Sequence, residues 1–358
     1  MDIRKTPYSN LKIFDHADVI RALKEEKRVA PVYVRIKPTN YCNHKCSYCS
    51  YADKDLVNWI NEEKKKKQIP WENMQAILED MQSMGVKAIT FSGGGEPLLY
   101  PHIEESLQRV LDAGIDLSII TNGHLLKGQK ADLLAKSKWV RVSMDAANAE
   151  TYAKIRQLPL QAFDEVCDNI RAFAKIKEGS CELGVNFVVT HENAEQIYDM
   201  AKLLKGLGVN HVKYTARVME NLFEYHEPIR ENVIAQIYAG EKEFNGDGFS
   251  VINKYESDFD APLINKRLYK KCYMNDITAV IGADENVYFC HDKAYSEAGK
   301  VGDLSLTSFK ELWFLDEVVK RYKNFDAEEE CCHHCVYDDR NELLGAFFGM
   351  DRNHINFI

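Results

Sequence analysis

From residue 31 onward, short apolar runs rich in β-branched residues alternate with longer stretches whose apolar residues recur every three to four positions. The short runs predict strands and the longer stretches predict amphipathic helices. The expected strands are 32–36, 88–91, 117–121, 140–143, 183–189 and 211–214. The expected helices are 71–84, 103–113, 130–135, 162–177 and 194–207. Gly85, Gly114 and Gly208 follow three of these helices, where a left-handed cap favours glycine.

Strands that alternate with helices in this way are typical of an α/β fold with a parallel sheet. The pattern contains six strand–helix units, which are too few for the usual eight-stranded barrel. We therefore expect a partial (β/α)6 TIM-like barrel at residues 31–225, preceded by an N-terminal extension at 1–30.

The pattern changes after about residue 226. A helical stretch and a loop around 245–260 precede the segment TAVIGADENVYF, in which two β-rich runs flank a turn. A helix is expected at 309–322, followed by a cysteine-rich segment. These features predict a linker or substrate-side insertion at 226–270, a small α+β domain at 271–340 and a C-terminal tail at 341–358.

Composition and charge narrow the class of protein. The chain has 46 Lys and Arg against 55 Asp and Glu, a net charge of −9, which argues against a broad nucleic-acid surface. No stretch reaches the roughly 18 apolar residues that span a membrane, and the start shows no export signal. We expect a cytoplasmic protein without nucleic-acid or membrane partners, whose ten cysteines serve mainly as metal ligands.

The first cysteine group, Cys42, Cys46 and Cys49, follows the first predicted strand directly. Barrel enzymes carry their active sites at this end of the strands. Three thiolates can hold three irons of a [4Fe-4S] cluster and leave the fourth iron open to another ligand. A structural zinc site is the alternative, although His44 lies inside the loop rather than at the usual distance for a fourth ligand.

The motif CxxxCxxC, with Tyr48 before its last cysteine, resembles the radical S-adenosylmethionine (SAM) superfamily. The run Gly93 to Pro97 after the second strand, which includes Gly94, Gly95 and Glu96, is similar to the GGEP element of that family. The resemblance implies that backbone groups and this glutamate hold the amino group of SAM. Glycine would let the backbone approach the ligand closely.

Further residues at the ends of later strands resemble the same family. Asn122 ends the third strand, and Ser143-Met144-Asp145 is similar to the Ser-x-Asp element after the fourth. Arg156, where the chain enters the next helix, matches the arginine that commonly pairs with the SAM carboxylate, for which a guanidinium is well shaped. Contacts to the SAM ribose and adenine are expected from two strand residues, Asn186 and Tyr214.

A second cysteine group lies in the C-terminal part. Seventeen residues separate Cys272 from Cys290 around the predicted hairpin, and Cys332 and Cys335 form a CxxC motif. This arrangement resembles the Twitch domain, a short relative of the SPASM domain, and implies one auxiliary [4Fe-4S] cluster. A zinc site on the same four cysteines is the alternative, and Cys331 is an alternative ligand to Cys332. Cys167 and Cys181 are expected to be small buried residues instead.

The resemblance implies that an electron from the first cluster cleaves SAM and that a 5′-deoxyadenosyl radical then abstracts hydrogen from the substrate. An auxiliary cluster would accept a second electron, which favours dehydrogenation of a hydroxyl-bearing sugar, aminocyclitol or nucleotide-sugar. An external donor such as flavodoxin or ferredoxin is implied. Asp145, Asp292 and Tyr295 are candidate general bases.

The sequence leaves three alternative functions to compare with this one. A RiPP-type peptide maturase that forms crosslinks would need a recruited leader-binding partner, since only about 30 residues precede the first strand. A radical sugar epimerase or dehydratase remains open, because an auxiliary cluster does not require net oxidation. A non-catalytic iron–sulfur carrier would leave the Gly93–Pro97 element unexplained.

Overall fold

The structure is a computed structural model that describes residues 8–54, 59–179, 181–217, 219, 221–260, 267, 269–331 and 335–356. The strands in these residues form one sheet in the order β10-β9-β8-β1-β2-β3-β4-β5-β6-β7. Their bounds are β1 Tyr33–Ile36, β2 Ala88–Phe91, β3 Asp116–Thr121, β4 Trp139–Ser143, β5 Glu182–Val189, β6 His211–Ala216, β7 Ser250–Asn253, β8 Thr278–Ile281, β9 Asn286–Tyr288 and β10 Lys300–Asp303.

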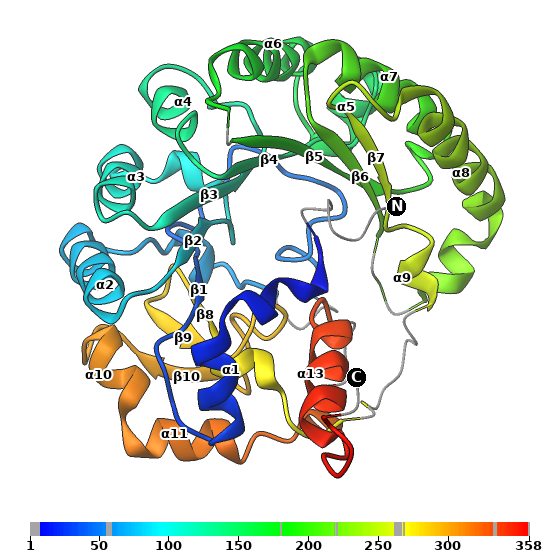
Figure 1. The fold of residues 1–358 in the computed structure, drawn as a ribbon. Helices are drawn as coiled ribbons and strands as arrows, with labels where there is room; N and C mark the ends of the chain where they lie inside the picture. The colour runs from blue at the N-terminus through cyan, green and yellow to red at the C-terminus, as the bar shows by residue number, and fades with distance from the viewer. Residues whose placement is uncertain are drawn as a thin grey trace.

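Strands β1 to β7 pair in parallel and in chain order, and helices lie along the outer, convex side of the curved sheet (Figure 1). The helices of the barrel part are α2 Trp71–Met84, α3 Ile103–Asp112, α4 Gln129–Leu134, α5 Ala149–Arg156, α6 Gln161–Ile176, α7 Ile197–Leu207 and α8 Leu222–Phe244. Those outside it are α1 Ala17–Lys24, α9 Ser257–Asp260, α10 Phe309–Phe314, α11 Asp316–Lys323, α12 Ala327–Glu330 and α13 Asp338–Gly349. Short 3₁₀ helices are η1 Asn10–Asp15, η2 Lys64–Lys66, η3 Pro97–Leu99, η4 Ala194–Gln196 and η5 Tyr273–Asp276.

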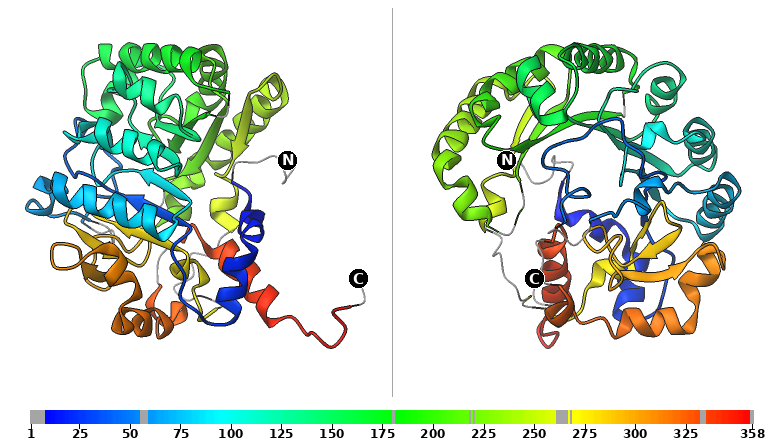
Figure 2. Two further views of the ribbon diagram at one scale, coloured as in Figure 1. Left: turned by 60° about the vertical axis from the view of Figure 1, so that its left-hand side comes forward. Right: turned by 180° about the vertical axis from the view of Figure 1, so that it is seen from behind.

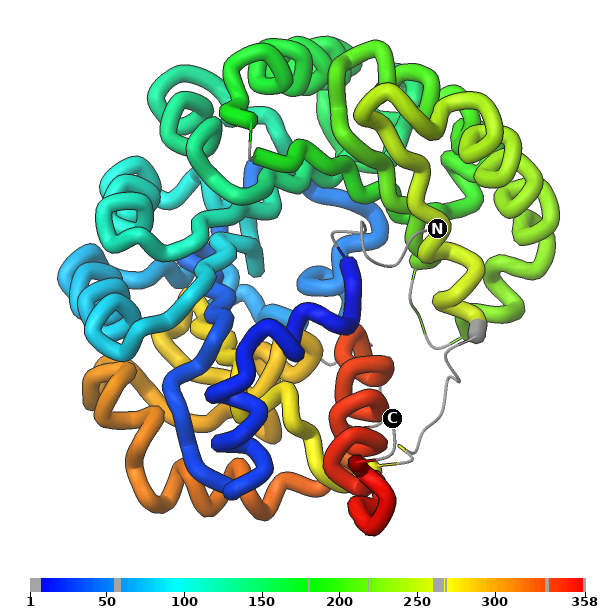
Figure 3. Tube along the Cα trace, in the orientation of Figure 1, coloured from blue at the N-terminus to red at the C-terminus, as the bar shows by residue number. Residues whose placement is uncertain are grey.

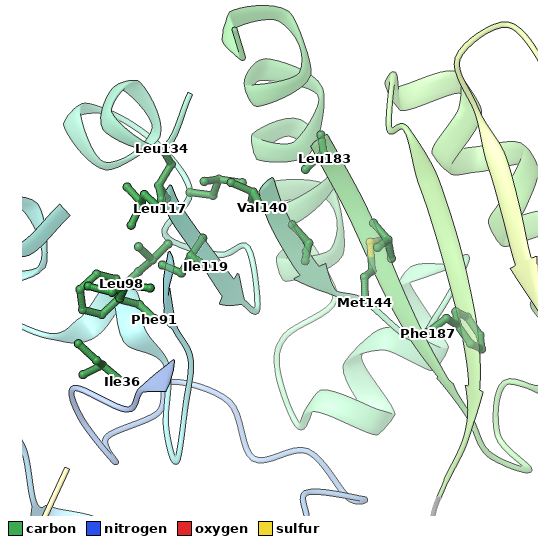
Figure 4. Close-up of a cluster of buried hydrophobic side chains, with 14 of the residues drawn as sticks. Ile36, Phe91, Leu98, Leu117, Ile119, Leu134, Val140, Met144, Leu183 and Phe187 are labelled. Carbon is green, nitrogen blue, oxygen red and sulfur yellow. The ribbon is translucent and has the colours of Figure 1, made fainter. Parts of the chain in front are cut away.

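The main core lies between the sheet and its helices, because every second strand residue points towards the helical layer. Figure 4 shows this for labelled side chains of β3, β4 and β5 such as Ile119, Val140 and Leu183, which are fully buried. The remaining strand positions point to the concave side, where the chemistry lies.

The six predicted strands are confirmed, as is the partial barrel, and they lie next to one another in chain order. Gly85, Gly114 and Gly208 have the expected positive φ angles of 77°, 68° and 83°. The loop expected around 245–260 instead contains β7 and α9, and the expected helix at 309–322 is two helices, α10 and α11. It breaks because Leu315 takes an extended conformation, with φ −63° and ψ 130°.

The C-terminal region is joined to the barrel through the sheet itself. Strand β8 pairs in parallel with β1, and the predicted hairpin forms from β8 and β9, with β10 added antiparallel at its edge. Segments from the two ends of the chain also pack together, as α1 and α13 do in Figures 2 and 3. Their contact surrounds a small apolar cluster that includes Leu23, Ile277 and Leu344. No helix among the described residues is long and apolar enough to cross a membrane.

Candidate functional site

The cysteine loop that follows β1 is held by the end of helix α5. The backbone N–H groups of Lys45 and Ser47 donate to the carbonyl oxygens of Arg156 and Ile155, at 3.1 and 2.9 Å. A helix leaves its last carbonyl groups free for partners of this kind. Cys42 is exposed on this loop, and Cys46 and Cys49 are partly exposed, so the three thiols lie at the surface of the carboxyl ends of the strands.

Arg156 links this loop to β4. Its guanidinium forms an ion pair with Asp145, in which the two side chains are only 4% and 1% exposed. The Arg156 Nη1 also donates to the Cys46 Sγ at 3.3 Å, while its Nε is buried without a hydrogen-bond partner. Arg156 ends α5 rather than lying where the chain enters a helix, and the end of the helix is what carries it to the cysteines.

Asp145 has both carboxylate oxygens engaged. Its Oδ2 accepts from Tyr48 and Arg156, and its Oδ1 accepts from the Val188 backbone N–H at 2.9 Å. Its backbone carbonyl accepts from the fully buried Asn193 side chain at 2.9 Å. Burial and then hydrogen bonding to this carboxylate keep the pKa of Tyr48 well above its ordinary value, although the arginine opposes the shift. Tyr48, Asp145 and Arg156 therefore form one buried polar group beneath the cysteine loop.

The glycines after β2 are packed against the start of the cysteine loop. A Cβ atom on Gly94 would lie 1.9 Å from the Asn40 Oδ1, and one on Gly95 would lie 2.1 Å from the Tyr41 carbonyl oxygen. The Gly95 N–H donates to the Thr39 carbonyl oxygen at 3.1 Å. Close approach requires glycine here, as expected, but the groups approached in this structure belong to the protein itself: a side chain at Gly94 and backbone at Gly95.

Glu96 is buried and bridges two strand ends. Its Oε1 accepts from the Leu98 N–H at 3.0 Å and the Thr121 hydroxyl at 2.6 Å, and its Oε2 accepts from the Asn122 N–H at 2.7 Å. Burial raises the pKa of Glu96, and these donors oppose the shift. The Asn122 side chain donates in turn to the Asn43 side chain at 2.8 Å, so that this bridge also reaches the cysteine loop.

The remaining cofactor candidates lie on adjacent strands. Ser143 and Asn186 are paired across β4 and β5, and the Asn186 side chain donates to the Thr215 hydroxyl at 3.4 Å. Tyr214 is not available for a SAM contact, because strand alternation turns it to the helical side. It is fully buried there, and its hydroxyl donates to the Ile197 carbonyl oxygen of α7 at 2.6 Å.

The second cysteine group gathers beside η5 and the end of β9. Cys272, Cys290 and Cys335 belong to one apolar cluster, in which burial raises the pKa of Cys272 to about 12. Burial is the main cause that raises the pKa values of Cys272 and Cys290, and the charge of the nearby Cys331 adds to both shifts. Cys332 lies outside the described residues.

The three candidate bases have different surroundings. Asp145 is engaged as above, and the Tyr295 hydroxyl donates to the Asn40 side chain at 2.5 Å and accepts from the Ala283 N–H at 3.2 Å. Asp292 has a buried Oδ2 without a hydrogen-bond partner. Burial raises the pKa of Asp292 to about 6, against the effect of Arg35 and Lys37.

Four basic residues near the candidate bases were not predicted as site residues from the sequence. Arg35 on β1, Arg141 on β4 and Lys213 on β6 alternate with buried apolar residues, and Lys37 follows β1 directly. The signal in the sequence is a basic residue between two β-branched or aromatic residues in each strand. Such a residue points away from the helical layer.

The donors fit an iron–sulfur cluster at the first cysteine group. Three thiols on one eight-residue loop are soft ligands suited to iron. The unpartnered Nε of Arg156 lies in the same group as a donor for an anion. Within the described residues no three His, Cys, Asp or Glu side chains converge as they would around a single ion. A four-iron cluster spreads its ligands more widely than one ion does.

Known proteins that resemble this chain include enzymes with SAM bound in their structures. The chain is 28% identical over 204 residues to a probable GTP 3′,8-cyclase of Saccharolobus islandicus, a match that spans 55% of this chain and 62% of that protein. Streptococcus suis SuiB bound to its precursor peptide SuiA superposes with a TM-score of 0.63 at 18% identity, over 91% of this chain and 76% of SuiB. The enzyme anSMEcpe with bound AdoMet gives 0.59 at 21% identity, over 87% and 88% of the two chains.

These two structural likenesses show the fold, and the sequence profile shows the family. The profile of the radical SAM superfamily matches residues 36–232, more than half of the chain, and this range contains the cysteine loop, the glycine run and Arg156. The chain therefore belongs to the radical SAM superfamily, whose members cleave SAM with a [4Fe-4S] cluster.

Proposed function

We propose that this enzyme oxidises a hydroxyl-bearing sugar, aminocyclitol or nucleotide-sugar, and that a second [4Fe-4S] cluster accepts an electron from the substrate. The observation that carries the proposal is the packing of Cys272, Cys290 and Cys335 in one cluster near Cys331. The parallel pairing of β8 with β1 supports it, because the same sheet carries both cysteine groups.

Residues at the carboxyl ends of the strands would bind SAM. Arg156 would offer its unpartnered Nε to the SAM carboxylate. The backbone around Gly94, Gly95 and Glu96 would hold the amino group, and Tyr48, Asn122, Ser143 and Asn186 lie on the neighbouring loops and strand ends. When bound, the cluster on Cys42, Cys46 and Cys49 supplies the electron that cleaves SAM.

The net reaction balances without another oxidant. The substrate CH–OH group becomes a carbonyl, SAM becomes methionine and 5′-deoxyadenosine, the latter takes one substrate hydrogen, and one proton is released. Among the three candidates, Asp292 is best placed to take that proton, because one of its oxygens is unpartnered. Asp145 and Tyr295 hold neighbouring groups instead.

The test is iron and sulfide content of the anaerobically reconstituted enzyme. We expect about eight irons per chain in the wild type, and about four in either a Cys42/Cys46/Cys49 triple Ala variant or a Cys272/Cys290 double Ala variant. Cys167→Ala is the matched control, because this buried cysteine lies on α6 and should leave the iron content unchanged. One zinc in place of four irons at the second group would contradict the auxiliary cluster.

The reaction class is tested by deuterium transfer. Deuterated sugar alcohols, sugar nucleotides and peptides are offered in turn with dithionite and SAM, and deuterium in 5′-deoxyadenosine is measured. Transfer from a sugar together with a ketone product supports the proposal. Transfer from a peptide with formation of a crosslink, or from a sugar whose product is an epimer or a dehydrated sugar, would replace it.

A further inference from the structure

The concave side of the sheet carries a set of basic side chains, which we define as Arg35, Lys37, Arg141 and Lys213. Their strand neighbours Val34, Ile36, Val140, Val142, Val212 and Tyr214 are fully buried in the main core. Since side chains alternate along a strand, the basic residues point to the opposite, concave side. They come from three strands of one curved sheet and therefore converge rather than diverge.

The charge of Arg35 acts on both lysines, and the charge of Arg141 acts on Lys213, so the basic residues lie close to one another. Burial and then the charge of Arg35 lower the pKa of Lys37 to about 7. Burial and then the charge of Arg141 lower the pKa of Lys213 to about 7, with a further contribution from Arg35. All four basic residues thus lie within one region.

The protein holds these residues mainly with neutral groups. The Lys37 Nζ donates to the Tyr51 hydroxyl at 2.9 Å and lies 4.6 Å from the centre of that ring. The Arg35 Nε donates to the Tyr33 hydroxyl at 3.3 Å. The Arg141 Nε is buried without a hydrogen-bond partner, and its guanidinium carbon lies 5.8 Å from the Trp139 ring.

Carboxylates are few in this region and are used elsewhere. Among the described residues, none of the four basic side chains forms an ion pair with a carboxylate. Asp258 faces Lys213 but accepts from the Ala216 N–H at 3.0 Å, and Asp284 accepts from the Tyr288 hydroxyl at 2.7 Å. Asp292 is left as the carboxylate that faces Arg35 and Lys37. Buried charges without counter-charges are costly, so that a bound anion would stabilise this arrangement.

We propose that Arg35, Lys37, Arg141 and Lys213 bind a phosphoryl group of the substrate, which would then be a nucleotide-sugar or another sugar bearing phosphate or diphosphate. This rests on the proposed function and narrows its substrate class. Two guanidinium forks and two ammonium groups match the several oxygens of a diphosphate, whereas one carboxylate would engage a single fork.

The register of the sheet places this anion site deeper than the cysteine loop. Arg141 precedes Ser143 by two positions on β4, and Lys213 lies level with Ser143 through its pairing with Asn186. The cysteine loop and Arg156 lie beyond the ends of these strands. A phosphoryl group on the basic residues would therefore leave the sugar part of the substrate between them and SAM, where hydrogen abstraction takes place.

The test is anaerobic calorimetry on the reconstituted enzyme with SAM present, using uridine diphosphate, inorganic pyrophosphate and uridine as probes. Uridine diphosphate should bind, and uridine should bind more than about tenfold more weakly. Arg141→Gln and Lys213→Met should each weaken the diphosphate about tenfold or more. Arg171→Gln, a change to an exposed residue of α6, is the matched control and should leave the affinity unchanged.

Two measurements separate this proposal from others. Iron content and 5′-deoxyadenosine formation without substrate should be unchanged in both variants, which shows that they fold and still cleave SAM. If uridine diphosphate and pyrophosphate bind the wild type no better than uridine, or bind the two variants as they bind the wild type, the phosphoryl site is wrong. If the wild type binds them but forms no oxidised sugar, the site stands and the proposed dehydrogenation fails.

Discussion

Arg156 and Asp145 form an ion pair that is almost completely closed off from solvent, and the same guanidinium donates to the Cys46 thiol. A charge in this position depends on its partner, because neither can be solvated on its own. The pair thus connects the stability of the barrel to the geometry of the cysteine loop.

Asp145→Asn should lower the free energy of unfolding by about 3–5 kcal/mol, since it leaves the Arg156 charge buried without its counter-charge. Adding Arg156→Gln should recover part of this loss. Anaerobic urea unfolding measures both. Asp168→Asn removes an exposed ion pair with Arg171 and should cost at most about 1 kcal/mol. If Asp145→Asn and Asp168→Asn lower the free energy of unfolding equally, groups other than Asp145 must balance the charge of Arg156.

Gly95→Ala should disrupt the first cluster. Its Cβ would lie 2.1 Å from the Tyr41 carbonyl oxygen, a rigid backbone atom next to Cys42. We expect the iron content to fall by about four per chain and 5′-deoxyadenosine formation to be lost. Gly206→Ala, where a Cβ meets nothing within 4 Å, should bind iron like the wild type. Normal iron content in Gly95→Ala would show that the loop can shift without losing the cluster.

The affinity for uridine diphosphate should fall as pH rises from about 7 to about 9. The pKa of Lys213 is about 7, lowered by burial and by Arg141, against an ordinary value of 10.5. Arg35 and Lys254 also lower this pKa and Asp258 raises it. The Lys213 amine is therefore largely neutral above pH 7. It must take up a proton before it can bind an anion. Below pH 7 the amine is already charged and the affinity should level off.

Calorimetry in buffers of different ionisation enthalpy measures this proton uptake. Lys37 has a pKa of about 7 as well, so that Lys213→Met should reduce the uptake rather than abolish it. A pH-independent affinity over this range would show that both amines stay charged in the free enzyme.

Tyr295→Phe and Asp292→Asn should differ in their effect on turnover. The Tyr295 hydroxyl joins Asn40 to Ala283, so that its loss should slow SAM cleavage and sugar oxidation to a similar extent. Asp292→Asn should leave SAM cleavage intact and slow sugar oxidation by about 10²-fold or more, as expected for a general base. The ratio of ketone to 5′-deoxyadenosine is the measurement, and an unchanged ratio in Asp292→Asn would exclude this carboxylate as the base.

Periodicity predicted the barrel well because its strands are apolar and its helices amphipathic over several turns. It missed β7, since Ser250–Asn253 is a short strand in which only Val251 and Ile252 are buried. It also joined α10 and α11 into one helix, because the sequence across Leu315 contains neither Gly nor Pro to mark the break.

The motifs placed the cysteines, Glu96 and Arg156 near one another, but a motif does not show which atoms are already engaged. The partners of Asp145 and Tyr295 come from residues 43 and 255 positions away, and only the fold brings them together. Tyr214 was misassigned because its neighbours, rather than its type, decide which side of β6 it occupies. The basic residues were overlooked as single charges in separate strands, and they become a group only when the sheet curves.

The pairing of β8 with β1 has a consequence for electron transfer. Four residues of one strand are aligned with four of the other, from Tyr33 beside Thr278 to Ile36 beside Ile281. The first cysteine loop leaves from one of these strands, and the other leads through a hairpin to Cys290. Backbone hydrogen bonds therefore hold together the two strands from which the cysteine segments leave, so that the proposed second cluster would keep its spacing from the first even if the loops around the substrate changed.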